Sequence, residues 1–374
     1  METKYNTVKN QIRSLILQGF YQPHQKMGSE SELMKKYDVS RHTIRKAIDD
    51  LVNEGWIYKK QGAGTFCAER SNVAGRNGSR TKNIAVITTY FSDYIFPTII
   101  RGIEGYLSQK GYQITVFSTN NDPVLEGKYL ETVLSQSFDG LIVEPTKSAL
   151  PNPNINYYLN IERLGIPYVM INAYYDELEP VHIIMDDAEG GKMQTAHLID
   201  QGHRHILGFF KNDDIQGIKR MKGFIKAHRQ AGLPIAPQNI VTYTTENRVN
   251  QPVDQLREKL SVSTDQLPTG IVCYNDQLAI LLLDVLRDLN VSVPGDISLV
   301  GFDDSFLSVA TEVKLTTIRH PQDELGTKAG ETIHQLIREK EDPSLPKEAA
   351  AVMYQPELVI RKSTKDMNTQ IVHT

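Results

Sequence analysis

The 374-residue sequence predicts a multidomain chain: an N-terminal winged helix-turn-helix domain of the α+β class, followed by an α/β domain of two doubly wound lobes. Two observations predict this architecture. A basic helix that Ser40 can cap is preceded by another capped helix and followed by a glycine-tipped hairpin, which together indicate a winged helix. From residue 84 onward, short apolar segments alternate with helical patterns, which is typical of parallel sheets covered on both faces.

Charge is distributed unevenly along the chain, whose net charge is −4. Residues 1–82 carry fifteen Lys and Arg against eight Asp and Glu, whereas residues 83–374 carry twenty-six against thirty-seven. A basic head on an acidic body is typical of a polyanion-binding module attached to a part with another partner. The only cysteines, Cys67 and Cys273, form no disulfide framework or zinc pattern. With no signal peptide and no run near the roughly 20 apolar residues of a membrane span, we expect a cytoplasmic protein without a membrane partner.

Residues 1–67 are expected to form the winged helix, a DNA-binding domain. Ser29, with Glu32 three residues later, is a capping box that begins the second helix, and Ser40 is a good N-cap for the third. The third helix is apolar on one side and basic on the other. Its basic residues are Arg41, His42 and Arg45. Two arginines one turn apart can bind guanine in a major groove, and the alternative is a solvated basic surface.

A hairpin completes this domain, with strands expected at 56–60 and 65–67 and a glycine-rich tip at 61–64. Together with the capped helices, the hairpin resembles the GntR family of winged helices. That resemblance implies that the two arginines contact bases or phosphates, that Glu30 enters the major groove and that the wing tip enters the minor groove. His24 departs from the family, which usually has glycine there. The expected DNA-binding residues are Glu30, Arg41, His42, Thr43, Arg45, Lys46, Gln61, Gly62 and Gly64.

The rest of the chain is expected to comprise a flexible linker at 68–82, a two-lobed effector and dimerisation domain at 83–362, and a C-terminal tail at 363–374. Strands are expected at 84–87, 114–117, 141–143, 168–171, 183–185, 206–210, 240–243, 270–274 and 298–302. Helices are expected between most of them, for example at 97–109, 188–200, 217–230 and 278–289. Ligands of such sheets bind just beyond the carboxyl ends of the strands.

Polar and aromatic side chains follow these strand ends. Carboxylates, amides, an arginine and aromatic rings in one cleft suit a sugar, whose hydroxyls take paired hydrogen bonds and whose ring face packs on an aromatic side chain. The motifs at 139–143, 202–206 and 300–304 resemble the LacI/periplasmic sugar-binding family, over about residues 83–362. That resemblance places at effector-contacting positions Glu144, Gln216, Arg220, Asn275, Asp303 and His320. After the first strand, further candidates are Asp93, Tyr94 and Phe96.

Several of these residues have simpler alternatives. The aromatic candidates after the first strand, Tyr94 and Phe96, can be core residues. Glu144 can be a solvated loop acid, and Arg220 can be a charge on a helix surface. Asp276 is expected to cap the helix that follows it rather than to contact a ligand. His203 and His205 form a His-x-His pair, but no metal is expected because no third ligand is apparent.

The whole chain resembles arabinose-responsive repressors that join these two domain types, most specifically at residues 94–97, 100–104 and 143–150. That resemblance implies a homodimeric transcriptional repressor that binds double-stranded operator DNA, is released by L-arabinose and needs no cofactor. An activator of the same architecture, a different sugar or a purine as effector, and an enzyme acting on sugars remain alternatives. The linker lacks any sign of the hinge helix of LacI-type proteins, so the route of the signal to the DNA-binding domain is open.

Overall fold

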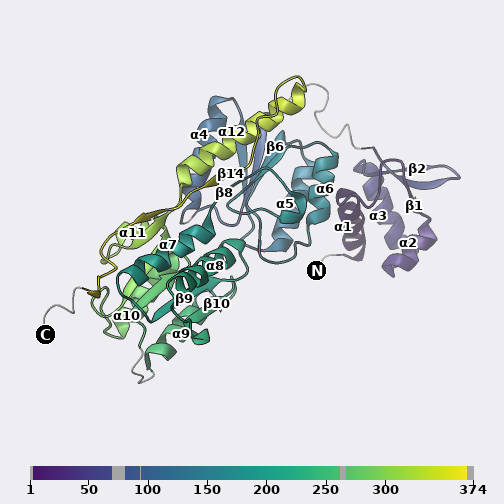
Figure 1. The fold of residues 1–374 in the computed structure, drawn as a ribbon. Coiled ribbons are helices and arrows are strands. Elements are labelled where there is room, and N and C mark those ends of the chain that lie inside the picture. The colour runs from purple at the N-terminus through teal and green to yellow at the C-terminus, as the bar shows by residue number, and fades with distance from the viewer. Residues whose placement is uncertain (1–2, 70–80, 93, 262–266, 369–374) are drawn as a thin grey trace.

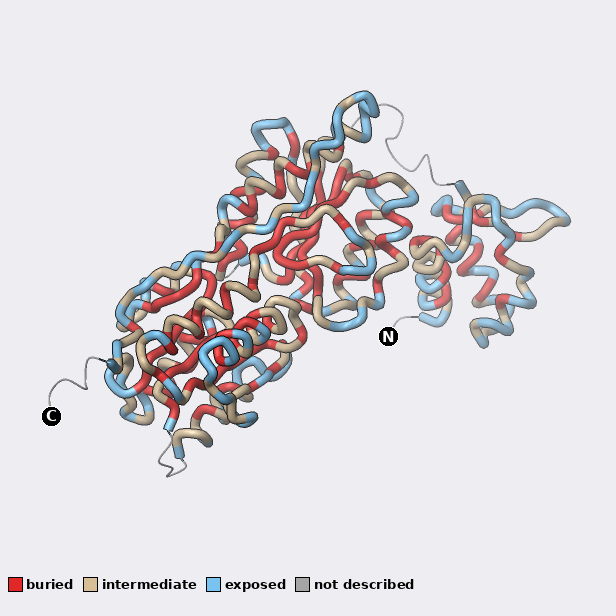
Figure 2. Tube along the Cα trace, in the orientation of Figure 1, coloured by how far each residue is buried: buried red, intermediate tan, exposed pale blue. Residues whose placement is uncertain are grey.

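The computed structural model describes residues 3–69, 81–92, 94–261 and 267–368. Most of the expected linker, the expected site residue Asp93 and the end of the expected tail therefore lie outside the described residues. Figure 1 shows the winged helix at the N-terminus beside two α/β lobes. In Figure 2, buried backbone runs through the sheets of both lobes and through the helices of the winged helix.

Within residues 3–69, three helices pack on a three-stranded antiparallel sheet in the order β1-β3-β2. The helix-turn-helix and the wing are confirmed. The three-residue strand β1, which pairs with β3, was not among the expected elements because so short a segment has no recognisable periodicity. The elements are α1 (Lys4–Leu17), β1 (Lys26–Gly28), α2 (Glu30–Tyr37), α3 (Arg41–Asn53), β2 (Ile57–Lys60) and β3 (Gly64–Cys67).

The second and third helices begin where the capping residues predict. The Glu32 carboxylate accepts a hydrogen bond from the Ser29 amide at 2.6 Å, and the Ser29 hydroxyl accepts one from the Glu32 amide at 3.3 Å, so the capping box is formed. The Ser40 hydroxyl accepts from the Thr43 amide. His24 has φ 64°, a left-handed conformation that glycine adopts more easily, which accounts for the family's preference for glycine there.

The N-terminal lobe contains a six-stranded parallel sheet in the order β14-β8-β7-β6-β4-β5. Its central strands are nearly continuous apolar runs because helices cover both faces. The elements of this lobe are β4 (Asn83–Thr88), α4 (Phe96–Gln109), β5 (Gln113–Ser118), α5 (Pro123–Ser135), β6 (Gly140–Val143), α6 (Ile155–Arg163), β7 (Tyr168–Ile171), the 3-10 helix η1 (Asp176–Leu178), β8 (His182–Met185), α12 (Gln322–Glu341) and β14 (Val352–Tyr354).

The C-terminal lobe contains a second six-stranded sheet, in the order β10-β9-β11-β12-β13-β15, parallel except for β15. Its elements are α7 (Asp187–Asp200), β9 (Ile206–Lys211), α8 (Ile215–Gln230), the 3-10 helix η2 (Pro237–Asn239), β10 (Ile240–Tyr243), α9 (Asn250–Ser261), β11 (Gly270–Cys273), α10 (Asp276–Asp288), β12 (Ser298–Asp303), α11 (Leu307–Ala310), β13 (Thr316–Arg319) and β15 (Glu357–Val359). The predicted class of two doubly wound lobes is confirmed.

The lobes are not two successive halves of the chain, as the strand pattern alone suggested. After β13 the chain returns to the N-terminal lobe, where α12 packs along α4 and β14 joins the sheet beside β8. The two helices approach closely because Gly102 and Gly326 have no side chain: a Cβ on Gly326 would lie 2.1 Å from the carbonyl oxygen of Ile99. β15 then returns to the C-terminal lobe, so the chain crosses between the lobes three times.

Residues 363–368 pack against the C-terminal lobe and are not a tail. Ser363 is fully buried, and its hydroxyl accepts from the Thr316 amide at 2.8 Å and donates to the Leu299 carbonyl at 2.5 Å. The Met367 amide donates to the Gln201 carbonyl at 2.8 Å. The expected domain end at 362 is therefore too early, because this polar segment satisfies backbone groups of β12, of β13 and of the residue after α7. Among the described residues, none of the helices has the length and apolar character to cross a membrane.

Candidate DNA-binding surface and effector cleft

The first half of α3 presents the basic residues that the sequence predicts for DNA contact. Arg41, His42, Arg45 and Lys46 are exposed, while the opposite face of the helix is fully buried in the core of the winged helix. The Lys46 ammonium lies 3.9 Å from the centre of the Tyr5 ring on α1, a cation–π contact that directs this side chain. The exposed face of α3 therefore offers a cluster of cations beside a helix N-terminus, which is what a phosphate backbone or a guanine edge requires.

Glu30 on α2 holds Arg45 in place. Its carboxylate accepts from Arg45 Nε at 2.9 Å, and both side chains are partly exposed. The Thr43 hydroxyl lies 2.9 Å from that of Ser40, at the start of the same helix. Three residues predicted for DNA contact, Glu30, Thr43 and Arg45, thus belong to one small surface shared by α2 and α3.

The wing tip presents backbone rather than bulky side chains. Gln61 and Gly62 are exposed between β2 and β3. Gly62 and Gly64 have φ 75° and 112°, a region that side chains disfavour, so glycine is required at both positions for the turn. A narrow, exposed tip of this kind can enter a groove where larger side chains would collide.

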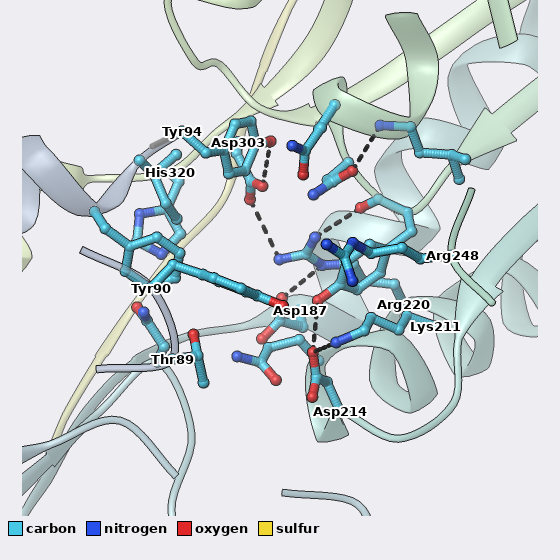
Figure 3. Close-up of a pocket in the computed structure, with 18 of the residues that line it drawn as sticks. Thr89, Tyr90, Tyr94, Asp187, Lys211, Asp214, Arg220, Arg248, Asp303 and His320 are labelled. Atoms are coloured by element: carbon cyan, nitrogen blue, oxygen red, sulfur yellow. Dashed lines mark hydrogen bonds and ion pairs between the residues drawn. The ribbon is translucent and has the colours of Figure 1, made fainter. Parts of the chain in front are cut away.

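A cavity of about 440 Å³ lies between the two lobes, beyond the carboxyl ends of strands from both sheets (Figure 3). The strand-end rule predicts this position. Asp93 lies outside the described residues. The other eight expected effector residues all line the cavity: Tyr94, Phe96, Glu144, Gln216, Arg220, Asn275, Asp303 and His320.

Arg220 on α8 is the centre of the charged network in the cleft. Its guanidinium donates to Asp187 at 2.8 Å, to Asp303 at 3.3 Å and to the carbonyl oxygen of Tyr274 at 2.7 Å. It also lies 3.5 Å from the centre of the Phe302 ring. Burial alone would lower the pKa of Arg220, but the charges of Asp303 and Asp187 outweigh burial and raise it. Arg220 is therefore a fixed cation and not the helix-surface charge of the alternative interpretation.

The side of the cleft formed by the N-terminal lobe centres on Glu144, which directly follows β6. Glu144 is buried and accepts from the Thr89 amide at 2.9 Å, from the Thr89 hydroxyl at 2.5 Å and from Asn172 at 2.8 Å. Burial raises the pKa of its carboxyl group. Glu144 is thus a positioned acceptor and not a solvated loop acid.

Tyr94 joins the two lobes across the cleft. Its hydroxyl donates to Asp303 at 2.6 Å and accepts from the Asp276 amide at 3.2 Å. Its φ of 62° places it in the left-handed region, which directs the ring toward the C-terminal lobe. Phe96 lines the cavity and also belongs to the core of the N-terminal lobe, so both interpretations of that residue apply.

The N-cap of α10 is Asn275 and not Asp276, the residue expected to cap this helix. Asn275 is the N-cap of α10, since its side chain accepts from the Leu278 amide at 2.9 Å, and it lines the cavity as well. The expectation that Asp276 caps this helix is therefore wrong. Asp276 is nonetheless structural: it is fully buried and accepts from the Ser305 amide at 2.8 Å and the Thr317 hydroxyl at 2.6 Å. Burial raises the pKa of Asp276 to about 7.

His320 follows β13 and has an unsatisfied polar atom in the cleft. Burial lowers the pKa of His320 to about 4, so its ring is neutral at neutral pH. Within the described residues, His320 Nδ1 is buried and has no hydrogen-bond partner. A buried polar atom without a partner is rare in a folded protein, and a ligand hydroxyl can satisfy it.

The cleft also contains residues that were not among the predicted site residues, notably a basic and acidic group around Lys211 (Figure 3). Lys211 at the end of β9 is buried and pairs with Asp214 at 2.5 Å and Asp213 at 3.5 Å. Most of the missed residues follow strand ends, so the rule that located the others could have located them. They are Thr89, Tyr90, Asn172, Asp187, Lys211, Asp214, Arg248 and Tyr274.

The first residue of the His-x-His pair, His203, has a structural role. His203 Nδ1 lies 3.0 Å from the Thr269 hydroxyl and Nε2 lies 3.3 Å from the carbonyl oxygen of Lys365, so both ring nitrogens are occupied. No cluster of three or more metal-ligating side chains occurs among the residues that the structure describes.

Comparisons with known proteins agree with both halves of the chain. Residues 4–67 match the gntR family of bacterial regulatory proteins, and residues 195–364 match the periplasmic binding protein-like domain. An arabinose metabolism transcriptional repressor of Halalkalibacterium halodurans is 60% identical over 372 residues, 99% of each chain. A repressor of the same name from Geobacillus stearothermophilus is 47% identical over 97% of this chain and 98% of that one. The solved structure of the transcription regulator CcpA of Lactococcus lactis has a TM-score of 0.65 at 24% identity, over 76% of this chain and 100% of that one, which shows the fold.

Proposed function

Because this chain belongs to the family of arabinose metabolism transcriptional repressors, we propose that L-arabinose binds in the cleft and thereby releases it from operator DNA. Repression of transcription follows from the family, whereas the effector and its action are the proposal. One observation carries it: the basic face of α3 is exposed, while a second, polar site is enclosed between the lobes. The exposed basic face suits a polyanion such as DNA, and the enclosed polar cleft suits a small polar ligand.

The cleft suits a neutral, hydroxyl-rich ligand. Its fixed cation, Arg220, is already balanced by Asp187 and Asp303, so a ligand need not bring charge. Carboxylates such as Asp303 and Glu144 can accept from sugar hydroxyls, and the guanidinium can donate to the same hydroxyls. Tyr90 and Phe96, whose ring centres are 5.8 Å apart, border the cavity and offer apolar faces to a sugar ring.

The winged helix is proposed to bind DNA through α3 in the major groove and the wing in the minor groove. Arg41 and Arg45 would contact guanine or phosphate, and Gln61 to Gly64 would follow the minor groove. Two copies of the chain would occupy a pseudo-palindromic operator whose half-sites are about one helical turn apart, or a multiple of it. We therefore infer a homodimer acting in the cytoplasm.

We expect no turnover of the sugar. The carboxylates of the cleft are held by Arg220, Thr89 and Asn172, which favours fixed acceptors over groups that exchange protons. The proposal includes no cofactor.

The experiment is an operator-binding titration with and without effector. Fluorescence anisotropy of operator DNA would be measured with purified protein, and calorimetry would compare L-arabinose, D-xylose, D-ribose and hypoxanthine. We expect L-arabinose to bind and to weaken operator binding. Binding of hypoxanthine alone would contradict the sugar effector, tighter operator binding with L-arabinose would indicate an activator, and consumption of L-arabinose would indicate an enzyme.

A further inference from the structure

The winged helix contacts the N-terminal lobe through α1, which packs against α6; we call this α1–α6 contact the seat. The Tyr157 hydroxyl on α6 lies 2.7 Å from the Ser14 hydroxyl and accepts from Gln18 Nε2 at 3.0 Å. One turn further along α6, Asn160 Nδ2 donates to the carbonyl oxygen of Leu17 at 2.6 Å. In Figure 1, α1 lies between α6 of the lobe and α3 of the winged helix.

This contact is a packed interface with buried polar and apolar residues. Tyr157 and Asn160 are buried, and Leu17 belongs to an apolar cluster that continues from the winged helix into the N-terminal lobe. The Leu17 carbonyl is at the C-terminal end of α1, where backbone acceptors lack helical partners, and Asn160 satisfies it. Burial raises the pKa of Tyr157 to about 12, so its hydroxyl stays protonated and donates to Glu131 on α5 at 2.6 Å.

A chain of buried hydrogen bonds begins on α6 at Tyr158, next to Tyr157 in the same helix, and leads toward the cleft. The hydroxyl of Tyr158, the next residue of α6, donates to Glu126 on α5. The Tyr175 hydroxyl lies 3.0 and 3.1 Å from the two carboxylate oxygens of Glu126. The same hydroxyl accepts from the Thr146 amide at 2.9 Å. All four side chains are buried, so water cannot replace a bond that one of them loses.

This hydrogen-bond chain ends at Thr146, in the loop 144–150, which forms part of the cleft wall. Glu144 lines the cavity. Three residues after Glu144, the loop begins to contact the other lobe: Lys147 pairs with Glu246, and the Ser148 hydroxyl accepts from the Ile215 amide at 3.0 Å. One loop therefore lines the cavity, contacts the opposite lobe and joins the hydrogen-bond chain that leads to α6.

We propose that this chain, from the loop 144–150 through Tyr175, Glu126 and α6 to α1, couples the cleft to the winged helix and takes the place of a hinge helix. The coupling rests on the proposed function, because it needs an effector in the cleft. A sugar that hydrogen-bonds to Glu144 or changes the spacing of the lobes acts on the loop directly. The loop and α6 then move together, because the buried chain between them has no water to take up a broken bond. A shift of the seat changes how two winged helices are spaced in a dimer, and operator binding depends on that spacing.

The test uses conservative variants of the full chain. Tyr157→Phe removes the hydroxyl at the α1 end of the chain, and Tyr175→Phe removes the one at the loop end, while both retain their rings. Tyr168→Phe is the matched control, because Tyr168 is also a buried tyrosine and its hydroxyl donates to Glu162 at 2.6 Å, outside the hydrogen-bond chain. Operator affinity with and without saturating L-arabinose would be measured by anisotropy, and sugar affinity of the DNA-free protein by calorimetry.

We expect the wild type and Tyr168→Phe to show the same loss of operator affinity with sugar, of about 10- to 100-fold, within the usual range of allosteric coupling. In Tyr157→Phe and Tyr175→Phe this factor falls at least fivefold toward 1, while sugar affinity stays within about threefold of the wild type. Sugar binding also confirms that each variant is folded.

Trp56, the only tryptophan of the chain, provides a second readout. The Arg13 guanidinium lies 5.8 Å from its ring centre, and Arg13 pairs with Glu131 on α5 at 3.7 Å, so the environment of Trp56 includes the seat. L-Arabinose is expected to change Trp56 emission in the wild type and in Tyr168→Phe, but not in the other two variants. If Tyr157→Phe and Tyr175→Phe keep the wild-type coupling factor and emission change, the proposed coupling route is refuted while the proposed function stands. A wild type whose operator binding ignores L-arabinose overturns the proposed function and the coupling together.

Discussion

Arginine serves both binding regions of this protein, but in opposite environments. On the DNA-binding surface, the Arg45 side chain is 59% exposed and pairs with one carboxylate, Glu30, at 2.9 Å. In the cleft, the Arg220 side chain is 5% exposed and pairs with two carboxylates, Asp187 at 2.8 Å and Asp303 at 3.3 Å. Water screens the exposed pair, so Arg45 can exchange its partner for DNA at little cost. If Arg220 moved away, Asp187 and Asp303 would remain buried without a counter-charge, so its guanidinium is held in place, as the proposed role of a preorganised donor to the effector requires.

The largest effect should follow from removing the buried cation. Arg220→Ala leaves Asp187 and Asp303 buried without a counter-charge, and we expect a loss of about 3–5 kcal/mol in the free energy of unfolding together with loss of the L-arabinose response. Urea denaturation and calorimetry would measure both. As a control, Arg287→Ala removes an exposed arginine that pairs with Asp284, and should change stability by less than about 1 kcal/mol. Equal effects of the two substitutions would remove the distinction between buried and exposed pairs.

On the DNA-binding surface, Arg41→Ala should affect DNA and not sugar. We expect operator binding to weaken by roughly 1–3 kcal/mol for a lost bidentate base contact, with reduced discrimination between operator and mutated sites. Calorimetry should give an unchanged affinity for L-arabinose. Arg257→Ala, which removes the same charge from the body of the protein, is the matched control and should leave operator binding unchanged. Unchanged operator affinity in Arg41→Ala would refute the base-reading role.

His320 should make the free energy of unfolding of the protein depend on pH. Its pKa is about 4 in the folded chain, because burial disfavours the charged ring, against about 6.5 when unfolded. The folded protein therefore binds fewer protons in this range, and stability is lost as pH falls below about 6.5. From pH 7.5 to 5 the loss from this residue should be about 2 kcal/mol. His320→Gln should remove that part of the pH dependence in chemical denaturation, and parallel curves for variant and wild type would contradict it.

The smallest effect is expected for the exposed pair itself. Glu30→Gln should change the free energy of unfolding by less than about 1 kcal/mol, because the pair with Arg45 is partly exposed and screened. Its effect should appear instead in operator preference, since Arg45 loses the group that directs it. Denaturation and a comparison of operator variants would test both expectations. A destabilisation as large as that of Arg220→Ala would mean that the two arginines are held in the same way.

Local sequence rules predicted much of this molecule. The caps at Ser29 and Ser40, the wing and the nine strands expected in the lobes depend on residues within a few positions of one another, and the structure contains all of these. The strands β14 and β15 were not among the expected elements. The same rules located the ligand site beyond the strand ends, and the family resemblance selected most of the candidate effector residues, of which eight of nine line one cavity. They assigned the cap of α10 to Asp276 rather than Asn275, because either residue type is a good N-cap and only backbone conformation selects between them.

The sequence by itself determined the element types, the two kinds of domain and the edge of the sheets where a ligand belongs, because these depend on periodicity and capping along the chain. Only the tertiary structure decided which distant residues meet. Asp187 and Arg220 are 33 positions apart, and α1 meets α6 across some 140 positions. Helix α12 and strand β14 return to the first lobe after the second has formed. Such contacts follow from the packing of whole elements, which leaves no periodic trace in the chain.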